Sequence, residues 1–373
     1  MKKVLILHSN LRGSISPNLV NKYKTNFPNI QVVPILFFET EKGVDYAIEQ
    51  FVVTPKTLSS FTREFDFSDV IAVQVSFMTG SKFYFVKHIP QNVMVLWGIP
   101  GGDLYNRYLR YFGYELYYNK QEGIKYRLGS LYRSYTRRKE FNYLMQRCSA
   151  VLCAKCDYDL ILKYCPSNIK GPQHIYSIAY QMDKALGDLY NQPFIKHERV
   201  HAIIGNSASR SNNHLYVLSQ LLNKGISDFD CGLLLSYGDS DDAYKQMVKT
   251  QYYKEFTDRV TFITDFVPLS EFNTRLLNVS HFLYGNWRQE SVGNILTAFY
   301  LGGKVYLSRK NPLLDYFRGK GFVVYCLEDI DHTFYDFLSE RDKHHNRSLI
   351  ESQYTQERSD LLFKTGLAPF YGC

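Results

Sequence analysis

Two successive runs of short apolar segments, separated by helical or loop sequence, constrain the fold of this chain more than any other feature. The first run lies at residues 3–8, 31–38, 69–76, 92–98, 149–154 and 172–178. The second lies at residues 199–204, 231–236, 260–264, 280–284, 304–308 and 322–326. Such alternation is typical of parallel βα units. Because 373 residues are long for one domain, we expect two successive α/β domains of Rossmann-like type.

A polar stretch at residues 183–198 separates the two runs and reads as a linker. We therefore predict an N-terminal domain at 1–185, a C-terminal domain at 186–350 and a final helix at 351–373. No apolar run approaches the roughly 18 residues that a membrane span needs, and the N-terminus lacks a signal-peptide core. The seven cysteines, odd in number and without a secretory signal, favour reduced thiols. We expect a cytoplasmic protein, soluble or peripheral on a membrane.

Several signatures of common enzyme classes are missing from the sequence. Neither half has Gly-x-Gly-x-x-Gly after its first strand, which argues against an NAD-type fingerprint. No Gly-x-x-x-x-Gly-Lys-Ser/Thr pattern occurs, which argues against a P-loop NTPase or kinase. Signatures of zinc proteases and serine hydrolases are missing as well.

Two strand–loop–helix segments of the second half have the composition of anion sites. Residues 284–294 place an arginine, a glutamate, amides and a glycine before a helix whose apolar positions are spaced at i, i+3, i+4, i+7 and i+8. Residues 205–213 are rich in Gly, Ser and Asn, and Asn212 is a plausible N-cap of the next helix. Free N–H groups and the helix dipole favour phosphate at such positions. A nucleotide ligand is the leading hypothesis, and ordinary capped turns are the alternative.

Residues 104–147 are unusually basic and aromatic. They hold ten basic side chains against three acidic ones, interleaved with tyrosines, in a chain whose net charge is +8. Amphipathic rings and cations suit a lipid headgroup interface, and single-stranded nucleic acid is the rival ligand. A solvated helical face is the third possibility. We expect an anionic membrane surface or lipid-linked acceptor, with no nucleic acid, and name as its cations Arg133, Arg137, Arg138 and Lys139.

Three blocks of the sequence resemble a known family. They are Leu96-Trp-Gly-Ile-Pro-Gly-Gly-Asp-Leu-Tyr105, Gly205-Asn-Ser-x-x-x-Ser-Asn-x-His214 and Arg288-Gln-Glu-x-x-Gly293. The chain resembles the bacterial transferases of enterobacterial common antigen synthesis, which move N-acetylfucosamine from a dTDP donor to a lipid-linked disaccharide. It departs from that family in having Glu290 where Gln is usual, and in a longer spacing between Trp97 and Asp103.

The resemblance implies a glycosyltransferase of the GT-B type. Its two Rossmann-like domains would face each other across a cleft, and a C-terminal helix would cross back to the N-terminal domain. It further implies a nucleotide-sugar donor, dTDP- or UDP-linked, in the C-terminal domain and a polyprenyl-diphosphate-linked or other glycan acceptor in the N-terminal domain. Such enzymes generally need no bound metal or other cofactor. The protein would act in cell-envelope polysaccharide synthesis, on the inner face of the cell membrane.

Site residues follow from the loops and the resemblance together. We assign the donor diphosphate to Gly205, Asn206, Ser207 and Arg288. Sugar or ribose hydroxyls are expected at Gln289, Glu290 and Asn294, with Gly293 in the same motif. Further donor contacts are expected at Ser236, Tyr237 and Gly238, which end a strand, and at Phe266 and Val267, which are candidates to hold the base.

The catalytic group is less sharply defined by the sequence. Asp103, on a glycine-rich loop after a strand, is a candidate general base for the acceptor hydroxyl if the reaction inverts the anomeric carbon. His8, at the end of the first strand, is the rival base. If configuration is retained, Glu290 or a backbone carbonyl near the donor is the candidate. The alternatives to transfer are a nucleotide-sugar epimerase or hydrolase on the same scaffold, or a non-catalytic module that binds membrane or nucleic acid.

Overall fold

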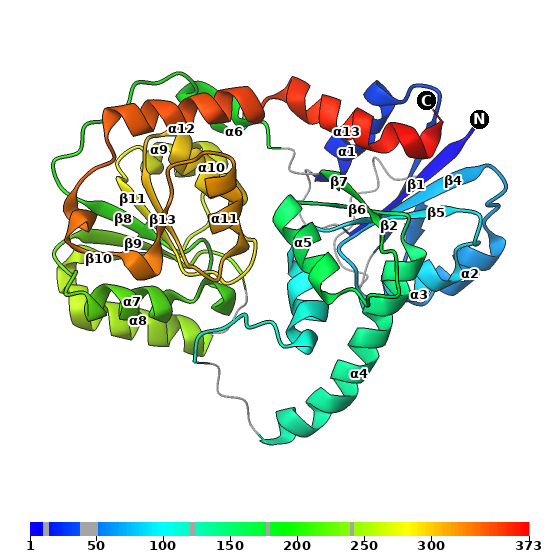
Figure 1. Cartoon of the computed structure of the whole chain (residues 1–373), viewed down its shortest axis with the longest axis horizontal. Coiled ribbons are helices and arrows are strands. Elements are labelled where there is room, and N and C mark those ends of the chain that lie inside the picture. Colours follow the sequence, from blue (N-terminus) through cyan, green and yellow to red (C-terminus); the bar gives the residue numbers. More distant parts are fainter. Residues whose placement is uncertain (10–14, 38–50, 120–123, 177–179, 239–241, 373) are drawn as a thin grey trace. The chain divides into compact units, whose positions relative to one another are not determined.

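The computed structural model describes residues 1–9, 15–37, 51–119, 124–176, 180–238 and 242–372 (Figure 1). Side chains are described for these residues except 8, 9, 15–18, 51, 52 and 124–130. The chain forms two compact units. Unit 1 comprises Met1–Tyr114, Glu122–Ile178 and Asp360–Cys373, and unit 2 comprises Glu115–Gln121 and Ala179–Ser359. Each unit is therefore assembled from segments that are distant in sequence.

The described residues of unit 1 form a seven-stranded parallel sheet with the order β3-β2-β1-β4-β5-β6-β7. Its strands are β1 (Lys3–Ser9), β2 (Gln31–Phe37), β3 (Phe51–Val53), β4 (Val70–Ser76), β5 (Met94–Gly98), β6 (Ala150–Cys153) and β7 (Gln173–Tyr176). Its helices are α1 (Ile15–Asn26), α2 (Leu58–Glu64), α3 (Gly80–His88), α4 (Ile124–Arg147), α5 (Lys155–Tyr164) and most of α13 (Gln356–Tyr371), with a π-helical turn η1 (Leu104–Tyr108) and a 3-10 turn η2 (Leu109–Phe112).

The C-terminal helix α13 completes the core of unit 1. It packs with α1 on one face of the sheet, where Phe363 and Leu367 join Tyr23 in one apolar cluster. The Tyr23 hydroxyl donates to Gln74 Oε1 at 2.6 Å and lies 3.0 Å from the Tyr371 hydroxyl. Residues from both ends of the chain are thus required to bury this face of the sheet.

The described residues of unit 2 form a six-stranded parallel sheet with the order β10-β9-β8-β11-β12-β13. Its strands are β8 (His201–Ile204), β9 (Asp230–Leu234), β10 (Val260–Ile263), β11 (His281–Tyr284), β12 (Lys304–Leu307) and β13 (Tyr325–Cys326). Its α-helices are α6 (Met182–Leu186), α7 (His214–Asn223), α8 (Asp242–Phe256), α9 (Leu269–Leu276), α10 (Val292–Tyr300), α11 (Pro312–Gly319) and α12 (Glu340–Gln353). Its short 3-10 turns are η3 (Gly187–Leu189), η4 (Arg210–Asn212), η5 (Thr257–Arg259), η6 (Leu327–Asp329) and η7 (His332–Tyr335).

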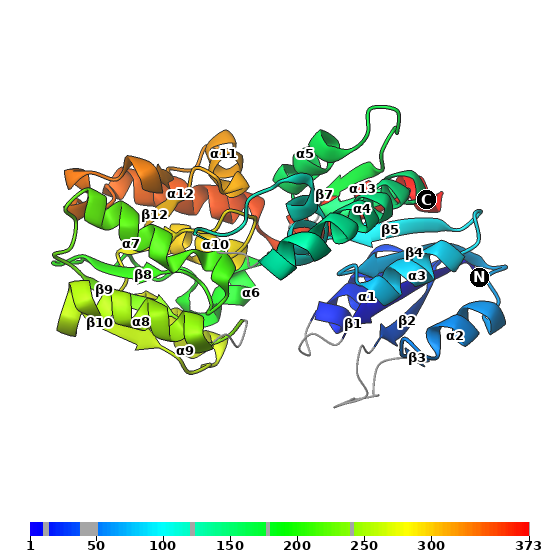
Figure 2. The same ribbon diagram turned by 90° about the horizontal axis from the view of Figure 1, so that it is seen from below.

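One core cluster of unit 2 lies between its sheet and the helices α7 and α8. These two helices lie side by side on one face of the sheet, and α10 and α12 lie on the other (Figures 1 and 2). Leu218 and Leu221 of α7 and Tyr252 of α8 pack against β8 and β9. Strands that are buried on both faces read as continuous apolar runs, which is how β8 and β11 appear in the sequence.

The architecture confirms the predicted fold class. Each of the twelve apolar segments named from the sequence overlaps a parallel strand. The structure adds β3, a strand of three residues at the edge of the first sheet. It also places short helices, α6 and η3, inside the stretch that the sequence suggested as a linker.

We predict that the contribution of α13 depends on its inner face. Leu367→Ala should lower the free energy of unfolding by about 2–5 kcal/mol, because Leu367 is fully buried and the cavity cannot collapse completely. Leu361→Ala on the same helix, where the side chain is 51% exposed, should change it by less than about 0.5 kcal/mol. Urea unfolding of both variants provides the measurement. Equal effects of the two substitutions would contradict the packing of α13 on unit 1.

Candidate functional site

The carboxyl ends of β8 and β11 mark a topological switch point in unit 2. From β8 the chain proceeds through β9 to β10 on one side, and then returns to place β11 on the other side of β8. The two loops singled out from the sequence, 205–213 and 285–291, leave the sheet at this point. In open parallel sheets the crevice at such a point is where ligands bind.

Loop 205–213 folds around the buried side chain of Asn212. Asn212 Oδ1 accepts a hydrogen bond from the Asn206 N–H at 2.6 Å, and its Nδ2 donates to Ser207 Oγ at 2.9 Å. Gly205 has a φ of 76°, and a Cβ at this position would lie 2.4 Å from His214 Nε2. Glycine is therefore required there for its backbone conformation and for space.

The sequence-based expectation that Asn212 caps the next helix is wrong. Helix α7 begins at His214, and its N-cap position is occupied by Asn213 in the left-handed region, with a φ of 49°. Asn212 instead closes the loop before it. His214 Nδ1 lies 3.1 Å from the Tyr244 hydroxyl. Burial lowers the pKa of His214 to about 4, so its imidazole is neutral at physiological pH.

Loop 285–291 leads into α10, whose first turn lies at the same carboxyl edge of the sheet. Its N-cap residue, Ser291, has a φ of 67°, and within the described part of the chain its side chain makes no capping hydrogen bond. The first-turn N–H groups of a helix have no intrahelical acceptor. Among the described residues, the buried atoms Asn286 Oδ1, Gln289 Oε1 and Ser291 Oγ have no hydrogen-bond partner. Buried polar atoms of this kind call for a ligand or water.

The two loops are joined by side-chain hydrogen bonds. Asn294 Nδ2 donates to Asn206 Oδ1 at 2.6 Å, and Ser211 Oγ donates to Glu290 Oε2 at 2.9 Å. The structure thus brings together residues that are separated in sequence by 88 and 79 positions. The composition of the sequence indicates each loop, and only the fold shows that the two loops lie against each other.

Arg288 and Glu290 form an ion pair inside loop 285–291. Arg288 Nε lies 3.0 Å from Glu290 Oε2, and Nη2 lies 2.9 Å from Oε1. The same carboxylate accepts from Asn286 Nδ2 at 2.7 Å. The two charged side chains are only 11% and 15% exposed. Glu290 therefore holds the guanidinium in a fixed orientation, and it also reduces the positive potential that an anion would meet.

The other predicted donor residues lie along the same sheet edge. Ser236, Tyr237 and Gly238 follow β9, and the Tyr237 carbonyl accepts from the Ala208 N–H at 2.6 Å, which ties this turn to loop 205–213. Gly238 has a φ of 110°. Phe266 and Val267 follow β10, one strand further out, and the Phe266 ring is 69% exposed.

The acceptor-side candidates lie in unit 1. His8 belongs to β1, and its side chain lies outside the described residues. Asp103 is buried, and its Oδ2 accepts from the Met78 N–H at 2.7 Å and from Trp97 Nε1 at 3.0 Å. Burial raises the pKa of Asp103, and these two hydrogen bonds partly offset the rise. Asp103 therefore fixes the loop after β5, and its role as a base stays a prediction.

The four predicted surface cations occupy the middle of α4, and the structure distinguishes them. Arg137 Nη1 lies 2.7 and 2.8 Å from the two carboxylate oxygens of Glu140. Arg138 Nε donates to the Tyr111 carbonyl at 2.8 Å, and Lys139 Nζ lies 4.4 Å from the Tyr135 ring centroid. Arg133 is exposed.

Sequence reasoning missed one segment of the site region. Residues 115–119, which we call the strap, come from the N-terminal half of the chain but belong to unit 2. Leu116 is buried, and Tyr118 contacts Trp287 in loop 285–291. The apolar Leu116 and the tyrosines around it were part of the basic, aromatic stretch, and nothing in their spacing signals a contact with residues so distant in sequence.

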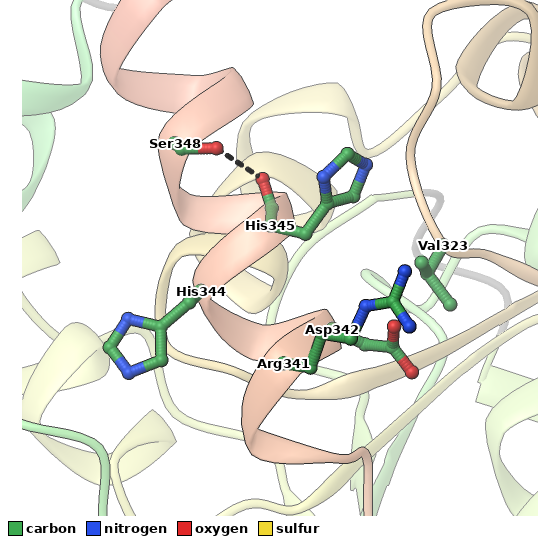
Figure 3. A pocket seen from close by; sticks show the side chains of 6 residues that line it. All are labelled: Val323, Arg341, Asp342, His344, His345 and Ser348. Carbon is green, nitrogen blue, oxygen red and sulfur yellow. Dashed lines mark hydrogen bonds between the residues drawn. The ribbon is translucent and has the colours of Figure 1, made fainter.

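Other features of the described residues do not add to this site. They contain no group of three or more His, Cys, Asp or Glu side chains that could hold a metal ion. No described helix is both long and apolar enough to cross a membrane. A shallow hollow of about 540 Å³ lies along α12, where it is lined by Val323, Arg341, Asp342, His344, His345 and Ser348. Figure 3 shows His344 pointing away from the others, and no predicted site residue lines this hollow.

We predict that Gly205 is required by its contact as well as by its backbone conformation. Gly205→Ala should destabilise unit 2 by clearly more than the roughly 1–2 kcal/mol that a left-handed alanine costs, because its Cβ overlaps the His214 ring. Gly225 is the matched control, since its φ is 68° and nothing lies within 4 Å of a Cβ there. Thermal or urea unfolding of both variants gives the comparison, and equal destabilisation would contradict the close packing of Gly205.

Comparisons with solved structures support the fold. The chain is similar to a glycosyltransferase from Rickettsia africae, with a TM-score of 0.63 and 11% identity over 100% of this chain and 98% of that one. It is also similar to a sucrose-phosphate synthase from Thermosynechococcus elongatus, with a TM-score of 0.67 and 10% identity over all of both chains. The lipopolysaccharide outer core galactosyltransferase WaaB matches with a TM-score of 0.63 and 12% identity over 99% of both chains. At these identities the likeness shows the GT-B fold.

Family membership rests on a separate comparison. Among curated proteins, no sequence matches the chain. The model of the 4-alpha-L-fucosyltransferase family, glycosyl transferase group 56, matches residues 79–362. This range covers all three sequence blocks and most of the chain, and it favours transfer over the epimerase, hydrolase and non-catalytic alternatives. The chain therefore belongs to the 4-alpha-L-fucosyltransferase family of glycosyltransferases.

Proposed function

We propose that the protein transfers a deoxy or amino sugar, similar to N-acetylfucosamine, from a dTDP- or UDP-linked donor to a lipid-linked glycan. The observation that carries the proposal is the joining of loops 205–213 and 285–291 at the switch point of the unit 2 sheet, through the Asn206–Asn294 and Ser211–Glu290 hydrogen bonds. An anionic ligand with several hydrogen-bonding groups suits this edge. A nucleotide diphosphate sugar has both properties.

The donor diphosphate would be held by backbone N–H groups and one guanidinium. In loop 205–213 the Ser207 N–H would contribute, because the N–H groups of Gly205 and Asn206 already donate to the Leu283 carbonyl and to Asn212 Oδ1. The first turn of α10, with Gly293 and Asn294, offers its N–H groups and dipole on the other side. Arg288 adds a guanidinium held in place by Glu290. Together these groups can stabilise the charge that develops on the leaving diphosphate. We propose that the reaction uses them in place of a bound metal.

The nucleotide base would stack on aromatic rings at the same sheet edge. The rings of Phe266 and Tyr237 are 69% and 40% exposed, and they follow adjacent strands, β10 and β9. Their exposed ring faces are large enough for a base to stack on. Gln289 and Asn294 would then face hydroxyl groups of the sugar or ribose. One neighbour in fold, MnaA of S. aureus, with a TM-score of 0.54 and 10% identity, was solved with UDP.

The acceptor hydroxyl would lose its proton to a base in unit 1. A general base must reach the substrate, and Asp103 is buried, with its carboxylate bonded to Met78 and Trp97. These contacts favour His8, at the carboxyl end of β1, as the base, with Asp103 holding the neighbouring loop.

We further propose that α4 holds the enzyme at an anionic membrane surface, where a lipid-linked acceptor would lie. Leu131 and Tyr132 are each 73% exposed and Tyr135 is 58% exposed. Leu131, Tyr135 and Lys139 are spaced at i, i+4 and i+8, so they share one face of the helix, and Tyr132 borders it. The exposed Arg138 borders this face next to Leu131, and the exposed Lys139 lies on it, whereas Arg133 points to the opposite side of the helix. Apolar and aromatic side chains beside cations match a bilayer interface.

We predict that Arg288 is required for donor binding. Arg288→Ala should weaken UDP and dTDP binding by roughly 10- to 100-fold, because a charge-assisted hydrogen bond contributes about 1.5–3 kcal/mol. Isothermal titration with each nucleotide gives the affinities. Arg275→Ala is the matched control, since Arg275 pairs with Glu271 on the surface of the same unit. Wild-type protein that binds neither nucleotide would overturn the proposed function.

We predict that membrane binding depends on the exposed face of α4. The double variant Leu131→Ser with Tyr135→Ser should reduce cosedimentation with phosphatidylglycerol-containing vesicles by about tenfold or more, since each buried apolar side chain contributes about 1.5–3 kcal/mol. Leu361→Ser with Tyr253→Ser is the control, because these side chains are 51% and 61% exposed elsewhere. Arg137→Ala should have little effect, since Arg137 pairs with Glu140. Binding that is insensitive to the α4 variant would exclude this surface.

A further inference from the structure

The strap, residues 115–119, is an element of unit 2 that the chain supplies from the middle of its N-terminal half. The described residues before it, up to Tyr114, and those after it, from 124 to 176, belong to unit 1. The chain therefore enters unit 2 early, contributes this short segment and leaves again before the main part of unit 2 begins at residue 179. Such an excursion costs conformational entropy, so its contacts must be favourable enough to offset that cost.

One side chain connects the strap to the candidate donor loop. The carboxamide of Asn213 accepts from the Tyr118 N–H at 2.9 Å and donates to the Leu116 carbonyl at 3.2 Å. Its Nδ2 also donates to the carbonyl of Gly285 at 3.1 Å, the first residue of loop 285–291. Asn213 and Leu116 are only 3% exposed. Hydrogen bonds buried from water are costly to break, so these bonds fix the position of the strap relative to the loop.

The strap also holds the indole of Trp287. The Tyr118 ring lies 6.4 Å from the Trp287 ring, at an interplanar angle of 78°, and Tyr216 lies 5.3 Å from it at 83°. Lys310 Nζ lies over the indole, 3.8 Å from the ring centroid, and forms an ion pair with Glu115 of the strap. Strap residues thus act on Trp287 directly through an edge-to-face ring contact and indirectly through a positioned cation.

Loop 285–291 needs support from outside because its internal bonding is incomplete. Ser291 adopts a left-handed conformation, which a non-glycine residue rarely takes without support from its surroundings. Within the described part of the chain, the buried atoms Trp287 Nε1, Gln289 Oε1 and Ser291 Oγ lack hydrogen-bond partners. Arg288 directly follows the clamped indole. Fixing Trp287 therefore fixes where the Arg288 guanidinium and the start of α10 can lie.

We propose that Leu116 and Tyr118 are positioning residues of the donor site, which hold loop 285–291 in the conformation that receives the donor diphosphate. This inference rests on the proposed function of that site. The strap acts through Trp287 and Gly285 and does not itself contact the donor. Its ring contact needs the Tyr118 side chain, whereas the hydrogen bond to Asn213 uses only the Tyr118 backbone.

That distinction gives a matched pair of variants. Tyr118→Ala removes the ring and keeps the backbone bond to Asn213, whereas Tyr118→Phe keeps both. Hydrogen exchange of the amides at 285–295, measured without nucleotide, should be faster in Tyr118→Ala and unchanged in Tyr118→Phe. The Kd for UDP or dTDP should rise about tenfold in Tyr118→Ala only. Tyr253→Ala, which removes a 61% exposed ring, controls for loss of a tyrosine.

Each result bears on the inference. Unchanged exchange at 285–295 in Tyr118→Ala would overturn the strap as a support, and faster exchange with unchanged nucleotide affinity would overturn its role in the donor site. If the wild type and Tyr118→Ala bind nucleotide equally well, this inference is wrong and the proposed function stands. If the wild type binds no nucleotide, the proposed function is wrong, and so is the assignment of the strap to a donor site. A KM for donor that rises in Tyr118→Ala while kcat is kept would support positioning.

Discussion

Two consecutive buried carboxamides, Asn212 and Asn213, determine how the site of unit 2 is built. Asn212 turns inward and closes its own loop through the Asn206 N–H and Ser207 Oγ. Asn213 bonds backbone groups of the strap and of Gly285. Because the two adjacent side chains bond different partners, one dipeptide connects three segments that are remote in sequence. Leaving any of these buried groups unpaired would cost about 1–3 kcal/mol.

The fold could be predicted from the sequence because each strand carries its own local signal. A run such as His201–Ile204 or His281–Tyr284 is apolar and bounded by glycine or polar residues, and parallel strands that are buried on both faces require that pattern. Strand β3 was not predicted, because three residues at a sheet edge are too few to show a periodic pattern. The placement of α13 on unit 1 was anticipated only by the family resemblance, since amphipathicity shows that a helix has a partner and not which partner it has.

The site was predictable in parts. Gly205, Asn206, Ser207 and Arg288 stand out as residues because loops that bind anions have a recognisable composition. Their mutual contacts do not show in the sequence, since hydrogen bonds between positions 88 apart leave no local periodicity. Asn212 was misread as a helix cap for the same reason: asparagine suits both a cap and a loop closure, and only the left-handed conformation of Asn213 decides between them. The strap left no signal at all in the sequence.

The Arg288–Glu290 pair changes what the site can bind. A buried ion pair is costly to desolvate and is retained most often where it fixes a geometry, and here Glu290 orients the guanidinium through two contacts while also accepting from Ser211 and Asn286. Glutamine, which the resembled family usually has at this position, could accept one hydrogen bond from Arg288 but would leave its charge uncompensated. With Glu290 the net charge of the pair is zero, so we expect Arg288 to act on a diphosphate through directed hydrogen bonds, alongside the first turn of α10, since most N–H groups of loop 205–213 already donate within unit 2. If the donor sugar lies beside this carboxylate, its hydroxyl and amide donors would be favoured over acceptors, and we therefore propose Glu290 as the residue that sets the donor preference of this chain.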